Sequence, residues 1–573
     1  MEPANGTPAP PRARVERGRS RNGCQTCVAK RVKCDEQHPC CGRCARLGSA
    51  CEWVRTRPSL AARRRGFGPI KYRQTNDWTP KPLLPKSRGL ARDDVTHTGR
   101  EEGSAGISNL SSSRPTSPLR SICEWDLSAT ECLPPSAQDS SIGNLQDVIT
   151  PIWLTAATPL FLVDATERSP SLGSNDRQAV AFHHSVLAPL KSTRPPLFSA
   201  HALFLRHTWN KRIALHFLLA VSHSEIAIYH GQGSHPTAES RFHLQKGIEL
   251  LVQVWNPVAL ADHLEVMLSF LYMYMFWMRR DRLAPLRFQA LSSTVLAYVR
   301  LYGINRLCTN EEIVSTSDNI NAVPENVLLC RVFSYLYDRD GFCSFFNCGG
   351  SFANYVNENP EASQKIWRLS RTAFLCLPRD CLGSGLNAVP EVEEAAVLQV
   401  YFELIRIHHR INIYSQGGSD DEGMRIQRQL GVLRKEQSSI FHRVGVEEEG
   451  LSPSLLELVT VSLFHAVCIY LCRSRSPLGD RPVPTEVQSA LSDLITTAHR
   501  TISRGSVQLL ERFQWSLLIL GLETNDPIHW DWVCVNISDS AIREVFRVCL
   551  QAKKRSGGRI SIATLRELVS GEG

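Results

Sequence analysis

The stretch GCQTCVAKRVKCDEQHPCCGRCARLGSACEW, residues 23–53, holds seven of the chain's 19 cysteines. Within it the spacing C-x2-C-x6-C occurs twice, and six residues separate the two copies. The six cysteines of this repeat are Cys24, Cys27, Cys34, Cys41, Cys44 and Cys51. Each copy supplies three thiolates, whereas a structural zinc ion is held by four ligands. Neither copy is complete alone, so the repeat predicts a single site in which two zinc ions share two of the six thiolates.

The seventh cysteine, Cys40, competes with Cys41 for one ligand position. A choice of Cys40 would change the spacing to x5 and x3 and break the repeat, so Cys41 is favoured. Cys40 is then a spare thiol, either redox-sensitive or inert. The segment has too few apolar side chains to fold by burial, and metal binding, which contributes about 10–16 kcal/mol for structural zinc, is predicted to supply its folding energy.

The two copies differ in charge. Lys30, Arg31 and Lys33 lie in the short helical segment of the first copy, whereas the second copy carries only Arg43 and Arg46. A Lys or Arg side chain at the end of a helix can bond O6 and N7 of guanine, which contributes about 1–3 kcal/mol of base discrimination. The first copy is therefore predicted to read base edges in double-stranded DNA.

Positive charge is concentrated at this end of the chain. Residues 1–75 contain 17 Lys and Arg against five Asp and Glu, a net charge of +12, while the whole chain has +9 and the remainder therefore −3. A basic end on a slightly acidic body is typical of an arm that contacts phosphate. The predicted DNA contacts, combining base and phosphate contacts, are Lys30, Arg31, Lys33, Arg43, Arg55 and Arg57.

Residues 23–53 closely resemble the fungal binuclear zinc cluster transcription factors. The features that match are the cysteine spacing, the basic run before the third cysteine, the CDE sequence that begins at that cysteine, and the loop proline Pro39. The resemblance implies that the first and fourth cysteines, Cys24 and Cys41, bridge the two metal ions. It also implies a nuclear protein that acts on RNA polymerase II genes, of metabolic or biosynthetic type.

The same resemblance assigns the reading of DNA. In that family CGG-type triplets are read in the major groove from the end of the first helix. The matching positions are Lys30 and Arg31, with Lys33 nearer the DNA backbone.

The rest of the chain is predicted to be mostly α-helical. Residues 1–22 are rich in Pro and Arg and 54–145 in Ser, Pro, Arg and Gly, and both are predicted to be disordered because they cannot bury enough surface to offset ordering entropy. Residues 146–573 are predicted to form a large all-α domain. The segments with helical periodicity are Ile213–His230, Glu239–Leu251, Leu260–Trp277, Val327–Leu336, Ala395–Ile413, Leu455–Leu471 and Trp515–Leu522.

More weakly, this body resembles the fungal-specific transcription factor domain that accompanies such clusters. The resemblance rests on Ile213–His230, the following helix, and WSLLILGLETNDPIHWDWV at 515–533. It implies a regulatory role.

The helical body shows no motif of a known catalytic site, so we predict that the chain is not an enzyme. The pair His408–His409 in IRIHHRI is interpreted as partly exposed surface, and Tyr272, Tyr274 and Trp277 as core. The apolar run around 267–278 is shorter than the roughly 20 residues of a bilayer span, so it is predicted to be a buried helix, with no membrane as partner. No secretory signal opens the chain, which predicts a reducing compartment.

The sequence leaves open which proteins the chain binds and two alternative functions. Pro58, Gly66, Gly68 and Pro69 interrupt the segment after the cluster, so a coiled coil is not expected, and a homodimer would form through the helical domain or not at all. The acidic and aromatic patch at 123–131 is a candidate contact for coregulators, although an ordinary linker has the same composition. The alternative functions are an enzyme with an accessory zinc module and a metal-thiolate or redox sensor.

Overall fold

The structure, a computed structural model, describes two parts of the chain. The described residues are 24, 26–27, 30, 32, 34–51, 53, 172–194, 198–254, 262–280, 282–309, 323–375, 392, 394–445, 452–474 and 483–570. The chain divides into two compact units, Met1–Phe67 and Gly68–Gly573. The segments 1–22 and 54–145, predicted to be disordered, lie outside the described residues.

The first unit is small and organised around cysteine. Its helix α2 spans Gly42–Arg46, and Cys41 is the N-cap residue, whose Sγ accepts a hydrogen bond from the backbone N–H of Cys44. Its buried cluster consists of five cysteines, against which Val32, Cys51 and Trp53 pack. Because the buried side chains among its described residues are all cysteines, this unit depends on its sulfur atoms for cohesion, as the sequence predicts.

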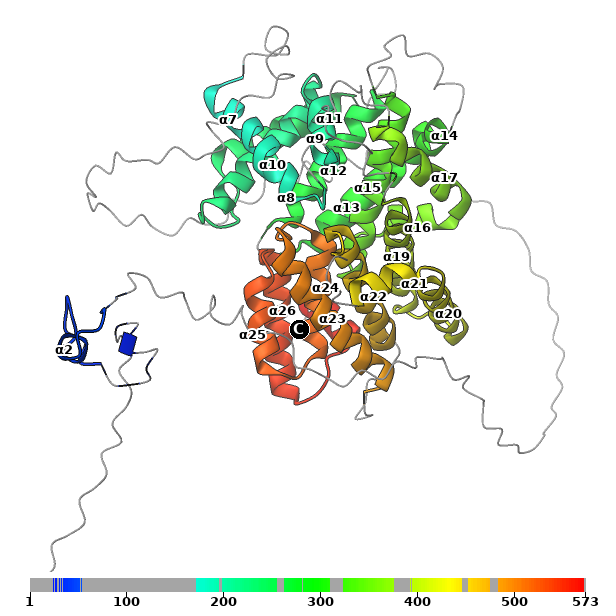
Figure 1. Cartoon of the computed structure of the whole chain (residues 1–573). Coiled ribbons are helices and arrows are strands. Elements are labelled where there is room, and N and C mark those ends of the chain that lie inside the picture. The colour runs from blue at the N-terminus through cyan, green and yellow to red at the C-terminus, as the bar shows by residue number, and fades with distance from the viewer. Residues whose placement is uncertain are drawn as a thin grey trace, which may run out of the picture. The chain divides into compact units, whose positions relative to one another are not determined.

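The second unit is built from helices, and no strand occurs among its described residues, so the prediction of a mostly α-helical fold is confirmed (Figure 1). The α-helices of its first part are α7 (Ser174–Phe182), α8 (Ala188–Leu190), α9 (Ala200–Thr208), α10 (Arg212–Tyr229), α11 (Ala238–Val254), α12 (His263–Met278), α13 (Pro285–Tyr302), α14 (Ile304–Thr309), α15 (Glu325–Phe345), α16 (Ser351–Glu358) and α17 (Pro360–Arg371). Those of its second part are α19 (Ala395–Tyr414), α20 (Asp420–Glu436), α21 (Ser438–Gly445), α22 (Leu455–Ser474), α23 (Thr485–Arg504), α24 (Glu511–Glu523), α25 (Pro527–Asn536), α26 (Ser540–Ser556) and α27 (Ile562–Ser570). A π-helical turn, His183–Leu187, joins α7 to α8, and a 3-10 turn, Thr372–Phe374, follows α17.

The core of this unit runs through a series of central helices. Helix α12 contacts α10 and α15, α15 contacts α19, and α19 contacts α22, which in turn contacts α23 and α24. In Figure 1 the earlier helices of the unit (cyan and green) lie above the last ones (orange and red). Most of the largest fully buried side chains, which include Trp515, Tyr272 and Tyr298, come from these helices and from α13. One continuous core therefore joins the early and late helices.

Two central helices are apolar on nearly every side. The residues Tyr272, Tyr274 and Trp277 of α12 are at most 5% exposed, so the prediction of a core helix is confirmed. Among the described residues, α22 is the one helix long and apolar enough to cross a membrane, but 83% of its apolar stretch is buried within the protein. Its composition is that of a helix that packs against neighbours on all sides.

The helix predictions are confirmed in type and differ in extent. Helix α15 is predicted at Val327–Leu336 but continues to Phe345, through the charged sequence Asp338-Arg339-Asp340. These charges suggest a surface, yet each pairs inside the fold: Asp338 with Arg512, Arg339 with Glu511, and Asp340 with the Tyr274 hydroxyl. Because the partners come from distant helices, local sequence does not reveal them.

The interpretation of His408–His409 as partly exposed surface is wrong. Both side chains are fully buried in α19. The Nδ1 atom of His408 lies 2.9 Å from the guanidinium of Arg512, and the Nε2 atom of His409 lies 2.8 Å from Oδ1 of Asn354. Long-range polar partners make the burial of two adjacent histidines tolerable.

A buried histidine in α22 makes the stability of the helical unit depend on pH. Burial lowers the pKa of His465 to about 4, against a raising effect of Asp493 and a further lowering by Arg434. Unfolded imidazoles titrate near 6.5, so below that pH the unfolded state binds a proton that the folded state does not. The contribution of neutral His465 to the free energy of unfolding is therefore complete above about pH 6.5, and it is lost as the pH falls toward 4.

We expect the free energy of unfolding to fall by about 2 kcal/mol more for the wild type than for His465→Gln when the pH is lowered from about 6.5 to about 5. Urea unfolding of both proteins at the two pH values measures this difference. Equal pH dependence of the two proteins would show that His465 is protonated in the folded state as readily as in the unfolded chain.

Candidate metal centre and nucleic-acid interface

The six cysteines of the repeat converge in the first unit. Cys24, Cys27, Cys34, Cys41 and Cys44 are each at most 3% exposed, and Cys51 is half-buried. Their sulfur atoms form two groups of four, and within each group all sulfur atoms lie within 4.8 Å of one another. One group is Cys24, Cys27, Cys34 and Cys41, and the other is Cys24, Cys41, Cys44 and Cys51. Cys24 and Cys41 belong to both groups.

The spacing of the sulfur atoms fits tetrahedral zinc. The Sγ atom of Cys24 lies 3.7 Å from those of Cys41 and Cys44, and the Sγ atoms of Cys27 and Cys41 are also 3.7 Å apart. A zinc–sulfur bond of about 2.3 Å gives a tetrahedron with an edge of about 3.8 Å. Six thiols arranged as two tetrahedra with a common edge can therefore hold two zinc ions. Two zinc ions can each have four sulfur ligands from only six thiolates if two of the thiolates are shared, and the two groups meet this requirement.

Backbone N–H groups point at the sulfur atoms and favour thiolates. Cys24 N–H donates to Cys34 Sγ at 3.5 Å, and Cys41 N–H donates to Cys51 Sγ at 3.2 Å. The N–H of Cys44 donates to Cys41 Sγ at 3.4 Å and lowers the pKa of the Cys41 thiol. The hydrogen bonds therefore repeat with the sequence, because in each copy the backbone N–H of the first cysteine donates to the Sγ atom of the third.

The two thiols common to both groups differ from Cys27 in acidity. Burial opposes ionisation of Cys24, but hydrogen bonds with Cys27, Cys51 and Cys41 together outweigh it and lower the pKa of Cys24. Burial raises the pKa of Cys27 to about 12. Hydrogen bonds thus favour the thiolate forms of Cys24 and Cys41, the two cysteines that belong to both groups.

Three residues without an assigned role in the sequence connect the two copies and the loop between them. Asp35 Oδ2 accepts from the N–H of Gly42 at 2.9 Å, at the start of α2, and a Cβ on Gly42 would lie 2.6 Å from that oxygen. Trp53 Nε1 donates to the carbonyl of Pro39 at 3.0 Å. Thr26 Oγ1 donates to the carbonyl of Ala50. The CDE sequence and the glycine after Cys41 were the available signals, but neither predicts that Asp35, in the loop between the copies, contacts Gly42 in the second copy.

Cys40 and Cys41 occupy different environments. Cys41 is fully buried among the other sulfur atoms, whereas Cys40 is exposed and belongs to neither group of four. The geometry therefore agrees with the spacing argument that favours Cys41.

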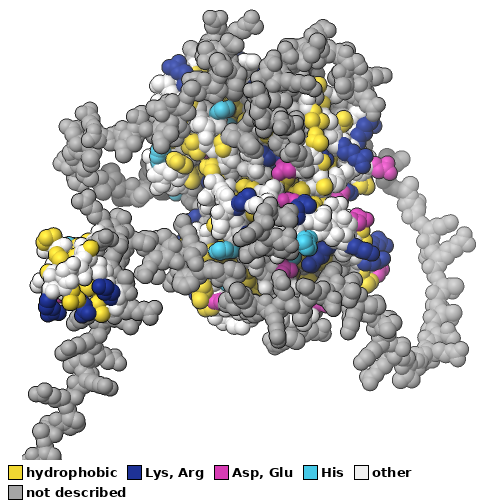
Figure 2. Space-filling model, in the orientation of Figure 1, with side chains coloured by type: hydrophobic (Ala, Val, Ile, Leu, Met, Phe, Trp, Pro, Cys, Tyr) yellow, Lys and Arg dark blue, Asp and Glu magenta, His cyan; other side chains and the backbone are white. Residues whose placement is uncertain are grey.

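The predicted DNA contacts are described only in part. Lys30 is exposed and follows Cys27 by three residues, and Arg43 is half-buried on α2. Lys and Arg side chains gather along one edge of this unit in Figure 2, where the described basic residues are Lys30, Arg43 and Arg46. Arg31, Lys33, Arg55 and Arg57 lie outside the described residues. The described basic side chains thus stand on the surface of a unit whose interior is sulfur.

A further group with metal-ligand chemistry occurs in the helical unit. The Nε2 atoms of His223 and His243 lie 3.0 and 3.1 Å from Oδ1 of Asp176, where α7 meets α10 and α11. The rings of the two histidines are stacked, with centroids 5.6 Å apart. Hydrogen bonds to the carboxylate account for this arrangement without an ion.

Comparison with known proteins identifies the first unit. The model of the fungal Zn(2)-Cys(6) binuclear cluster domain matches residues 22–60. The chain is 34% identical over 84 residues to a transcription factor of Pseudocercospora fijiensis, across 15% of this chain and 18% of that protein. It is 60% identical over 35 residues to the aspercryptin biosynthesis cluster-specific transcription regulator of Emericella nidulans, across 6% of each.

A third relative is the sorbicillinoid biosynthetic cluster transcription factor of Hypocrea jecorina, 32% identical over 114 residues and across 17% of each protein. The chain thus spans less than a fifth of the length of each of these relatives. No solved structure matches the chain.

Proposed function

Because residues 22–60 carry a fungal Zn(2)-Cys(6) binuclear cluster domain, which binds two zinc ions, we propose that this chain is a sequence-specific DNA-binding regulator of transcription. The observation that carries the proposal is the pair of four-sulfur groups that share Cys24 and Cys41. The relatives, which are named as transcription factors and regulators, support it and lend no support to an enzyme or a metal sensor.

In this proposal the six cysteines would hold the two zinc ions, and Cys24 and Cys41, which belong to both four-sulfur groups, would be shared between them. Bound zinc would supply folding energy to a unit whose buried side chains, among the described residues, are all cysteines. The contacts of Asp35 with Gly42 and of Trp53 with Pro39 fix the loop between the two copies, and Lys30 is presented on the surface. A rigid, cationic turn is what base-edge recognition in the major groove requires.

The remaining predicted contacts divide by role. Lys30 and Arg31 are proposed to bond guanine edges of CGG-like triplets, with Lys33 nearer the backbone. Arg43, Arg55 and Arg57 are proposed to contact phosphates, which fix orientation without reading sequence. The proposed site of action is the nucleus, and the targets are proposed to be metabolic or biosynthetic genes, as the names of two relatives suggest.

The helical unit is proposed to be regulatory. Its continuous core and its resemblance to the fungal-specific transcription factor domain support a stable body rather than a spacer. Homodimers, if formed, would use this unit, and coregulators are the further class of partner.

The base-reading role of Lys30 is tested by substitution. We expect Lys30→Ala to weaken binding to the preferred DNA site by about 1–3 kcal/mol and to relax base preference, since it removes a base-edge contact. Arg64→Ala, in the basic run beyond the cluster, should weaken specific and random DNA more evenly. Titrations of both variants against the selected site and a random duplex measure the two ratios.

The preferred site is first obtained by selection from random duplexes with the full chain. Equal losses on specific and random DNA for both variants would refute the assignment of Lys30. Selection that returns no enriched triplet would refute the proposed function itself.

A further inference from the structure

Three side chains from three helices meet at one point in the first part of the helical unit. Asp176 lies in the first turn of α7, His223 lies on α10 and His243 lies on α11. Helix α10 packs against both α7 and α11 (Figure 1). The two Nε2 atoms approach the same carboxylate oxygen, Oδ1 of Asp176, at 3.0 and 3.1 Å. Three side chains with metal-binding atoms, far apart in the sequence, thus converge in space.

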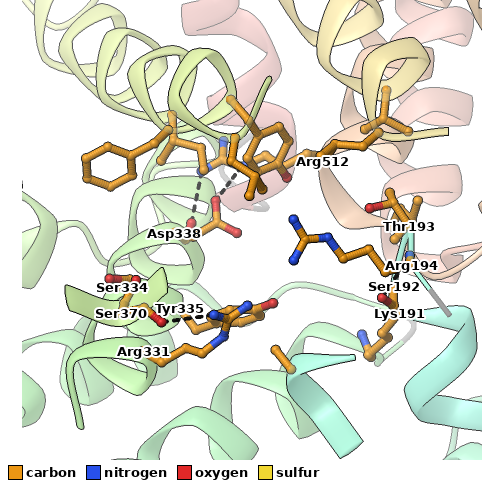
Figure 3. A pocket seen from close by; sticks show the side chains of 18 of the residues that line it. Lys191, Ser192, Thr193, Arg194, Arg331, Ser334, Tyr335, Asp338, Ser370 and Arg512 are labelled. Carbon is orange, nitrogen blue, oxygen red and sulfur yellow. Dashed lines mark hydrogen bonds and ion pairs between the residues drawn. The ribbon is translucent and has the colours of Figure 1, made fainter. Parts of the chain in front are cut away.

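The partners of Asp176 distinguish it from other paired carboxylates of the unit. Several of those pair with arginine, as Asp338 of α15 does with Arg512 of α24 at 2.7 Å (Figure 3). The ion-pair partners of Asp176 are two imidazoles instead. A guanidinium keeps its proton and has no lone pair for a metal ion, whereas a neutral imidazole has one on a ring nitrogen. Histidine at both positions therefore permits a chemistry that arginine would exclude.

The spacing of the three ligand atoms fits a single ion. They all lie within 4.8 Å of one another. Zinc bonds of about 2.0–2.2 Å at tetrahedral angles separate nitrogen and oxygen ligands by about 3.4 Å. The N···O distances of 3.0 and 3.1 Å are close to that separation, so small side-chain shifts would admit an ion. The side chains of Asp176, His223 and His243 are 21%, 10% and 7% exposed, which leaves a path for entry.

A third histidine supports the ligand role of His243. Nδ1 of His216 lies 2.9 Å from Nδ1 of His243, the ring nitrogen that does not face Asp176. Metal-bound histidines almost always make a hydrogen bond through their second ring nitrogen, and this contact supplies one.

The pair can reverse the direction of its hydrogen bond. When Nε2 of His243 carries the proton and donates to Asp176, Nδ1 accepts a hydrogen bond from His216. When Nε2 binds an ion, the proton is carried on Nδ1, which then donates to His216, and His216 carries its own proton on Nε2. The contact between the two histidines is therefore satisfied with and without an ion.

We propose that Asp176, His223 and His243 bind one divalent transition-metal ion of the zinc type. Imidazole and carboxylate together suit such an ion, whereas Mg²⁺ prefers oxygen ligands in octahedral geometry. Three protein ligands leave the fourth tetrahedral position open to water or to a further group. A bound ion ties α7 to α10 and α11. The site is independent of the proposed function, because its ligands lie in the unit Gly68–Gly573 and not in the cysteine cluster.

The zinc content of the full chain, measured after dialysis against buffered Zn²⁺, tests the binding. We expect the wild type to hold one zinc ion more per chain than each of Asp176→Asn, His223→Gln and His243→Gln. These substitutions can keep a hydrogen bond between the side chains but remove the ligand. An excess of Mg²⁺ should not displace the additional ion. Equal zinc content in the wild type and the folded variants, or displacement by Mg²⁺, would overturn the proposal.

The control variant is His230→Gln, because His230 is an exposed histidine that directly follows α10. It should hold as much zinc as the wild type, and a loss of one ion here would overturn the location. Circular dichroism shows which variants fold. If a histidine variant unfolds, Asp176→Asn decides, since Asn keeps an oxygen acceptor at a partly exposed position.

Hydrogen exchange provides a second readout, one that does not count ions. An ion that binds only the closed arrangement of α7 reduces its opening by a factor of 1 + [Zn²⁺]/Kd, which is about tenfold at ten times the Kd. We expect the backbone amides of α7 to exchange about tenfold more slowly under that condition in the wild type, and no change in His243→Gln. Unchanged exchange in the zinc-loaded wild type would overturn the role of Asp176 as a ligand.

The failure of this proposal differs from the failure of the proposed function. In Cys41→Ser the difference of one zinc ion between intact and substituted histidines should persist, because the two sites share no ligand. Loss of that difference in Cys41→Ser would overturn the independence of the site. A wild type that keeps this difference but recognises no DNA sequence would overturn the proposed function and leave the site intact.

Discussion

Replacement of Cys41 with serine should abolish sequence-specific DNA binding by the full chain, whereas Cys40→Ser should leave it unchanged. Cys41 belongs to both four-sulfur groups, so its loss removes a ligand from each proposed zinc site. It also removes the N-cap sulfur of α2. Because zinc supplies the folding energy of this unit, at about 10–16 kcal/mol for a structural ion, loss of a shared ligand should collapse the unit.

The expected effect is a drop of at least about a hundredfold in the affinity for the selected site, down to the level of random DNA, since specific sites are usually bound at least 10³-fold more tightly. Fluorescence anisotropy with specific and random duplexes measures it, together with the zinc content of each variant. Cys40 and Cys41 are adjacent, so the pair controls for chemistry and position. Equal loss in Cys40→Ser, or full binding by Cys41→Ser, would contradict the ligand assignment.

Arg279→Met should destabilise the helical unit by about 3–5 kcal/mol. At the end of α12, Arg279 binds both carboxylate oxygens of Glu225, at 2.7 and 3.2 Å, and Asp539 at 3.1 Å. All three side chains are at most 7% exposed. The substitution would leave two carboxylates buried without their cation, which costs more than the pair contributes when intact.

The control is Lys246→Met, because Lys246 pairs with Glu249 on the surface at 3.1 Å and both side chains are more than 40% exposed. This change should cost no more than about 0.5 kcal/mol. Urea unfolding followed by circular dichroism measures both. At a temperature where Arg279→Met is folded, its DNA affinity should equal that of the wild type. A loss below about 1 kcal/mol would mean that the three charges are not coupled as the structure shows.

Sequence alone predicts the features that repeat locally. Apolar residues that recur every three to four positions predict where the long helices lie, because this spacing puts them on the buried face of one helix. The doubled cysteine spacing predicts a shared metal site because ligand number is a fixed property of zinc. The sharing of Cys24 and Cys41 came from the family resemblance and not from spacing, and the two groups of four agree with it.

Features that join distant parts of the chain were missed. The burial of His408 depends on Arg512, which is 104 residues away. The contact of Thr26 with Ala50 joins the two cysteine copies across 24 residues. A charged residue in an apolar helix, such as Arg339 in α15, is a signal of a buried ion pair, but the sequence does not name its partner.

The most direct test of the account is the number of zinc ions that the cluster holds in the full chain. Native mass spectrometry of Cys40→Ser, which keeps only the six repeat cysteines in this segment, gives the total. The same chain with those six cysteines also changed to serine gives the contribution of the helical unit, including Asp176, His223 and His243. The account predicts a difference of two zinc ions per chain. A difference of one or none would contradict the shared-thiolate cluster on which the proposed recognition of DNA depends.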